Sequence, residues 1–102
     1  MNARIAFAAI LAACAVSATC LAEDDVQARS WAATCTGCHG TNGHSEGAIP
    51  SIAGRTQSEL IALMREFKNN ERPATVMHQH AKGYTDEQIA RIAAFFAKQK
   101  AR

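Results

Sequence analysis

Two segments of the chain, 56–68 and 85–98, carry apolar residues at the spacing of an amphipathic helix. Each begins with a threonine followed three residues later by Glu or Gln, the pattern that caps the amino end of a helix. These capping pairs are Thr56 with Glu59 and Thr85 with Gln88. The apolar stripes are Leu60, Leu63, Met64 and Phe67 in the first segment, and Ile89, Ile92, Ala93 and Phe96 in the second, with Phe95 at its edge. We therefore expect two helices that each pack one face into a core.

A third helix is expected ahead of these two, from about Asp25 to Cys35. The acidic residues Asp24 and Asp25 suit the positive amino end of a helix. Apolar positions then recur every three or four residues and end at a cysteine: Val26, Ala28, Trp31, Ala32 and Cys35. Trp31 should therefore pack in the core, one turn before Cys35.

The segments between the predicted helices are rich in loop-forming residues. Four of the six glycines fall between residues 40 and 54, together with Asn42, Ser45 and Pro50, so neither a helix nor a strand is expected there. The stretch 69–84 is also expected to be a loop between two helices. No segment shows a convincing strand pattern. The sequence therefore predicts an all-α fold with three main helices.

The first 22 residues have the pattern of a secretory signal peptide. A positive charge at Arg4 precedes an apolar run over residues 5–16, and small residues lead to Ala22. That run is too short to span a bilayer as a stable helix. Residues 23–102 would then form one domain in the periplasm, with no membrane-spanning segment. An alternative remains open, because residues 11–14 resemble a lipoprotein cleavage site that would leave a lipid on Cys14.

The sequence C-T-G-C-H at residues 35–39 is the strongest chemical signal in the chain. A C-x-x-C-H sequence is typical of the attachment site of a c-type haem. Helical spacing places Cys35, Cys38 and His39 on one face. Two thiols can then bind one haem c covalently as thioethers, while His39 coordinates its iron. Trp31, one turn earlier, is expected chiefly as a core residue and is also a candidate for contact with the porphyrin.

Two other kinds of site share part of this motif. A thioredoxin-like dithiol follows a strand, and nothing before Cys35 resembles one. A structural zinc site needs two further ligands, for which His78 and His80 are available. The remaining cysteines, Cys14 and Cys20, lie in the predicted signal peptide, so no disulfide is expected if the motif binds haem.

The second axial ligand decides whether the iron is closed to other molecules. A methionine thioether gives a closed electron carrier, and the predicted domain offers Met64 and Met77. Met64 belongs to a helical stripe and is better explained as core, whereas Met77 lies between two helices, where a loop can cross the haem face. We therefore predict that His39 and Met77 bind the iron. His78 or His80 in place of Met77 remains an alternative.

The charge of the chain is nearly balanced, with 11 Lys and Arg against 9 Asp and Glu. No basic cluster resembles a nucleic-acid-binding surface, so no nucleic acid is expected as a partner. A protein partner should instead recognise a local patch. Candidates for this patch lie around Thr36, Ala48, Ile49 and the Met77 loop, with Arg72 and Lys82 as charged contacts.

Taken together, these motifs resemble class I c-type cytochromes of the small periplasmic kind. The matching segments are C-T-G-C-H-G at 35–40, I-P-S-I-A-G at 49–54, Met77, and I-A-A-F-F at 92–96. The resemblance implies three helices and loops wrapped around one covalently bound haem. It implies that the Pro50 carbonyl accepts a hydrogen bond from His39. It also implies that the terminal helices cross with Ala28 and Trp31 near Phe95, at a position where many relatives have glycine.

The stretch from Arg72 to Ile89 resembles, more narrowly, the monohaem cytochrome subunit of flavocytochrome c sulfide dehydrogenase. That resemblance implies an FAD-containing partner that oxidises sulfide and passes electrons to the haem. We therefore predict a periplasmic single-electron carrier without catalytic residues of its own. A freely diffusing shuttle to an oxidase, peroxidase or thiosulfate-oxidising system is the alternative. A haem-based sensor or ligand-binding protein is a third interpretation.

Overall fold

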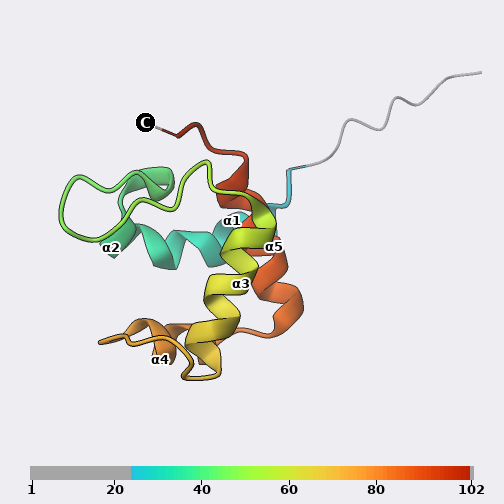
Figure 1. Ribbon diagram of the computed structural model, residues 1–102. Coiled ribbons are helices and arrows are strands. Elements are labelled where there is room, and N and C mark those ends of the chain that lie inside the picture. Colours follow the sequence, from blue (N-terminus) through green and yellow to red (C-terminus); the bar gives the residue numbers. More distant parts are fainter. Residues whose placement is uncertain (1–23, 102) are drawn as a thin grey trace, which may run out of the picture.

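The structure, a computed structural model, describes residues 24–101. Within that range it is all-α, as predicted, and contains no strand. Its elements are α1 (Val26–Ala32), η1 (Ala33–Cys35), α2 (Thr36–His39), η2 (Thr41–Gly43), α3 (Gln57–Lys68), α4 (Met77–Lys82) and α5 (Asp86–Ala97). Figure 1 shows that α5 packs against both α1 and α3, and that α4 lies beside α3. The predicted signal peptide and the alternative at Cys14 lie outside the described residues.

The two capped helices begin where their sequences predict. At α3, the Thr56 hydroxyl accepts a hydrogen bond from the Glu59 N–H at 3.2 Å, while the Glu59 carboxylate binds Arg55 at 3.0 Å. At α5, the Thr85 hydroxyl accepts the Gln88 N–H at 3.1 Å, and the Gln88 side chain accepts the Thr85 N–H at 2.9 Å. The second capping box is therefore complete, and the first is half formed because Arg55 takes the carboxylate.

Small side chains lie where α1 crosses α5. Ala28 and Ala32 are fully buried, so the crossing accommodates a methyl group where the resemblance implies glycine. Asp25 caps α1 by accepting the Ala28 N–H at 3.0 Å, and its two oxygens accept hydrogen bonds from Arg91 of α5 at 2.7 Å each. The core around this crossing is formed by Ala32, Leu60, Ile92, Ala93 and Phe96, with Trp31 and Phe95 packed against it. Packing and an ion pair thus fix α1 on α5.

The loop after α2 folds back onto Gly43. The Gly43 carbonyl accepts hydrogen bonds from the Ile52 and Ala53 N–H groups at 2.9 and 3.1 Å. Gly43 has a φ of +83°, and a Cβ there would lie 2.8 Å from the Ile52 side chain and 2.9 Å from that of Phe96. Glycine adopts this conformation and permits this approach without strain. The closure returns the loop containing Pro50 to the end of α2.

The segment 71–84 contains a short helix where the sequence predicted a loop. α4 has six residues, and no side chain caps its amino end. Ala81 is its buried residue, which gives too little apolar periodicity to predict a helix. Because α4 packs against α3, tertiary contact rather than local sequence explains why it forms. No helix of the described residues is long and apolar enough to cross a membrane.

Candidate haem-binding site

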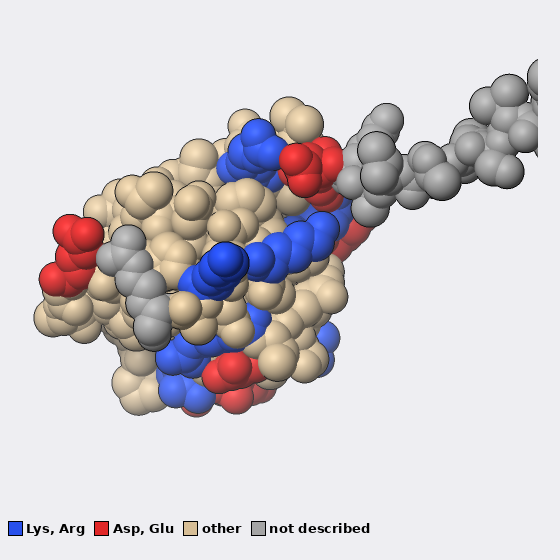
Figure 2. All heavy atoms as spheres, turned by 90° about the horizontal axis from the view of Figure 1, so that it is seen from above, with Lys and Arg blue, Asp and Glu red and all other residues tan. Residues whose placement is uncertain are grey.

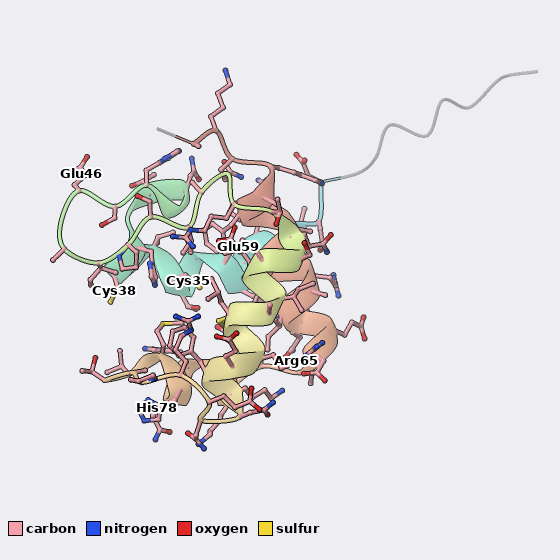
Figure 3. All side chains as sticks on the ribbon, viewed as in Figure 1. Cys35, Cys38, Glu46, Glu59, Arg65 and His78 are labelled. Carbon is pink, nitrogen blue, oxygen red and sulfur yellow. The ribbon has the colours of Figure 1, made fainter. Side chains whose placement is uncertain are left out.

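A cavity of about 400 Å³ is lined by the motif residues and by α3, α4 and α5. The motif region contributes Thr34, Cys35, Cys38 and His39, followed by Ile49, Pro50 and Ile52. The helices contribute Leu60, Leu63, Met64 and Phe67 from α3, Met77 and His80 from α4, and Ile89, Ile92, Ala93 and Phe96 from α5. Figure 3 shows Cys35 and Cys38 on the side of η1 and α2 that faces α4; these two elements are called the motif helices. The walls are mainly apolar, which suits a large apolar group.

His39 is buried at the end of α2 and is oriented by the folded-back loop. Its Nδ1 lies 2.7 Å from the Pro50 carbonyl oxygen. A carbonyl oxygen only accepts, so Nδ1 carries the proton and donates. In a neutral imidazole, Nε2 then keeps a lone pair that can bind a metal. The geometry matches the hydrogen bond that the resemblance implies.

The two motif cysteines are free thiols at the same end of the cavity. Cys35 is half-buried, and Cys38 is exposed. Burial raises the pKa of the Cys35 thiol above its ordinary value. A thioredoxin-like dithiol follows a strand, and no strand precedes Cys35 in the described part of the chain.

Zinc is not supported by the placement of the candidate ligands. Within residues 24–101, no three His, Cys, Asp or Glu side chains gather as a metal site requires. His80 lines the cavity, whereas His78 does not. The two histidines thus do not complete a four-ligand site with Cys35 and Cys38.

Met64 and Met77 both line the cavity, from α3 and α4 respectively. The helical stripe to which Met64 belongs thus faces the cavity as well as the core. Leu63 and Phe67, expected only as core residues, also form cavity wall. A three- and four-residue periodicity locates an apolar face, but it does not distinguish a core from a cofactor pocket.

Trp31 does not line the cavity. Its ring packs against the core, and the Arg91 guanidinium lies over it at 4.8 Å from the ring centre. The chain passes from α1 into the 3₁₀ turn η1 between Trp31 and Cys35, and Cys35 lines the cavity whereas Trp31 does not. The structure therefore assigns Trp31 to the α1–α5 contact.

The residues present fit a covalently attached haem. One wall supplies two thiols and an imidazole whose Nε2 is available, and α4 supplies a thioether. The remaining walls are largely apolar and come from α3 and α5. Thr34 and Tyr84 also line this cavity, although neither carries a sequence signal of a binding residue.

The chain matches a known family over most of its length. The family model for cytochrome c oxidase, cbb3-type, subunit III matches residues 22–96. The chain belongs to this family of c-type cytochromes. Membership implies a covalently bound haem c, and the protein is accordingly a cytochrome c electron carrier.

Three curated relatives of this cytochrome illustrate its similarity. It is 49% identical to the cytochrome subunit of sulfide dehydrogenase from Chlorobaculum tepidum, over 62% of this chain and 57% of that protein. It is 34% identical to cytochrome c4 of Pseudomonas aeruginosa, over 78% of this chain and 40% of that protein. It is also 34% identical to cytochrome c-554(548) of Halomonas halodenitrificans, over 66% of this chain and 86% of that protein. The cytochrome thus spans about half the length of the first two relatives.

Proposed function

We propose that the cytochrome carries one haem through Cys35 and Cys38, with His39 and Met77 as its axial ligands. The observation behind this proposal is that the motif and the α4 methionine line one cavity. When bound, the haem iron supplies a one-electron redox couple. The Pro50 carbonyl keeps the proton of His39 on Nδ1 and fixes the ring. The apolar side chains of α3 and α5 exclude water from the cavity.

The second axial ligand is tested with two matched methionine substitutions. Met77→Leu should abolish the methionine-to-iron charge-transfer band of the oxidised holoprotein. Met64→Leu makes the same change at a second thioether of the cavity and should retain the band. A band that survives in Met77→Leu but disappears in Met64→Leu would assign the ligand to α3 instead.

We further propose that this carrier works in the periplasm, after removal of residues 1–22, and accepts electrons from an FAD-containing sulfide dehydrogenase. The identity to the Chlorobaculum tepidum cytochrome subunit supports this donor. The cytochrome would be the electron-transferring subunit, with no catalytic residues of its own. Sulfide oxidation would take place on the flavoprotein.

The rim of the cavity offers an apolar surface for such a partner. Ile49 is 42% exposed and Val76 is 52% exposed, and both line the cavity. The basic residue Arg72 is already engaged, because its Nε lies 2.7 Å from the Glu66 carboxylate. Figure 2 shows Lys and Arg near Asp and Glu, rather than one charged field, on the face opposite α4. Docking would therefore rely on apolar contact at the rim more than on long-range attraction.

A freely diffusing shuttle is the second candidate function. It is supported by the match to cytochrome c-554(548), of which this chain covers 86%. Affinity purification of the holoprotein from native periplasm separates the two functions. A flavoprotein that copurifies and reduces the haem on addition of sulfide would establish the subunit role, whereas a cytochrome that purifies alone would favour the shuttle.

A further inference from the structure

A hydrogen bond between two side chains connects the haem motif with the segment that carries Met77. The Tyr84 hydroxyl oxygen lies 2.7 Å from that of Thr34, which is 50 positions earlier in the chain. Thr34 directly precedes Cys35, and Tyr84 lies two residues beyond the end of α4. Both residues line the cavity. The bond therefore runs from one wall of the proposed haem pocket to another.

The direction of this bond follows from the other contacts of Thr34. Its hydroxyl oxygen lies 2.8 Å from the Trp31 carbonyl oxygen, which can only accept. The single proton of Thr34 is therefore given to Trp31, and the Tyr84 hydroxyl must be the donor to Thr34. The Tyr84 backbone is held as well, because its carbonyl accepts the Lys68 ammonium of α3 at 2.7 Å. Tyr84 is thus fixed at its backbone and at the tip of its ring.

The other polar side-chain contacts of segment 71–84 lead elsewhere. Lys82 donates to Asn70 at 3.2 Å, and Arg72 donates to Glu66 at 2.7 Å. These contacts, like that of Lys68, tie the segment to α3 and the turn after it. The bond from Tyr84 instead reaches the motif helices. It is therefore placed to oppose separation of α4 from the wall that contains Cys35.

We propose that the Tyr84–Thr34 bond is a latch that holds Met77 against the haem, which makes both residues positioning residues for the axial ligand. This inference rests on the proposed role of Met77 as that ligand. An external ligand can replace Met77 when α4 moves away from the motif, and breaking the latch favours that movement. One net hydrogen bond corresponds to a change of roughly two- to tenfold in an equilibrium constant.

The latch is tested by titrating the oxidised holoprotein with imidazole and following the loss of the methionine-to-iron band. Tyr84→Phe and Thr34→Val each remove one hydroxyl and retain shape. Both should raise the apparent affinity for imidazole by roughly two- to tenfold. Because the two groups form one bond, the double variant should show the effect of a single variant. Thr34→Ser keeps the acceptor and should behave as the unsubstituted protein does.

A matched control lies two residues away. The Thr36 hydroxyl donates to the Ala33 carbonyl at 2.8 Å, the same local bond that Thr34 makes to Trp31. Thr36→Val should therefore leave the imidazole affinity unchanged. Amide hydrogen exchange over residues 77–82 provides a second measurement, and it should quicken in Tyr84→Phe and Thr34→Val alone.

Three results would overturn the proposal, and the first is distinguishable from the other two. If the unsubstituted holoprotein lacks the methionine-to-iron band, Met77 is not the ligand, and the proposed axial ligation fails together with the latch. If the band is present and is lost in Met77→Leu, but Tyr84→Phe and Thr34→Val bind imidazole as Thr36→Val does, Met77 remains the ligand and the latch fails alone. Additive effects in the double variant would likewise exclude a direct bond between the two hydroxyls.

Discussion

The two walls of the cavity that carry the proposed iron ligands are built very differently. The motif wall, residues 24–54, is anchored by buried Ala28 and Ala32, by the Asp25–Arg91 ion pair and by the loop closure at Gly43. The α4 wall, residues 71–84, consists of a six-residue helix without a capping side chain, preceded by six exposed residues. The first wall is part of the core, whereas the second packs on α3.

Because of this difference, the stability of the fold and the binding of the axial ligand should depend on different residues. A side chain on the motif wall is held by contacts that the whole domain needs, so its ligand position is as stable as the fold. A side chain on the α4 wall is held by packing on α3, and the exposed residues that precede α4 can open with a free energy below that of global unfolding. Substitutions in the motif wall should therefore affect stability, and substitutions in the α4 wall should affect the axial ligand.

The largest effect is expected when the motif wall loses both thiols. The double variant with Cys35→Ala and Cys38→Ala should contain no covalently bound haem. A haem stain after denaturing electrophoresis would show this. A predicted domain of 80 residues has a small core and depends on a bound group for stability. We therefore expect its circular dichroism melt to lose cooperativity. A native-like cooperative melt would show that the two walls fold without the haem.

The next largest effect concerns the α4 wall and leaves the fold intact. In Met77→Leu, we expect His80 to bind the iron in part, because His80 lines the cavity and His78 does not. The spectrum should be that of a low-spin iron with two histidine ligands. Adding His80→Ala should abolish that spectrum, whereas adding His78→Ala should not. A spectrum that depends on His78 would show that α4 turns during ligand exchange.

A smaller effect is expected from one methyl group in the loop of the motif wall. Gly43→Ala places a Cβ 2.8 Å from Ile52 and 2.9 Å from Phe96, at a φ of +83°. We expect the free energy of unfolding to fall by about 1–3 kcal/mol, measured by denaturant titration of the holoprotein. Gly47→Ala, in the same loop, meets no atom within 4 Å and should change it by less than about 0.5 kcal/mol. Equal losses in the two variants would show that the loop closure does not anchor this wall.

Much of the motif wall and of the helical framework could be predicted from the sequence, because their determinants are local. The capping residues Thr56 and Thr85 mark the first residues of α3 and α5 directly. The apolar period identifies the buried side chains of α5, and the spacing within C-x-x-C-H places three donors on one helical face. Each of these signals acts within about four residues of its source.

The α4 wall could not be predicted in the same way, because its structure depends on distant contacts. α4 forms on the surface of α3, and Tyr84 finds its partner 50 positions earlier in the chain. Trp31 packs against the core as its period predicts, but the period does not show that Arg91 of α5 covers the face of its ring. Local periodicity shows that a residue is partly buried, but the identity of its neighbour is set by the tertiary fold.

The smallest effect expected is a pH dependence of stability that comes from Asp25 and Arg91, the ion pair that anchors the motif wall. The hydrogen bonds from Arg91 and the Ala28 N–H lower the pKa of Asp25 from 3.8 to about 2. Since the folded-state pKa lies below the ordinary value, this stabilisation is fully present above about pH 4 and is lost as the pH falls towards 2. Asp25→Asn should therefore lower the melting temperature at pH 7, and its difference from the unsubstituted protein should shrink below pH 4. Asp24→Asn removes the neighbouring exposed ion pair with Arg29 and should have a smaller effect at pH 7.

Amide exchange measured at pH 3 should quicken in α1 relative to pH 6, after correction for the intrinsic rate. If exchange in α4 quickens by the same factor, acid loosens both walls together, and the separation between folding and ligation does not hold.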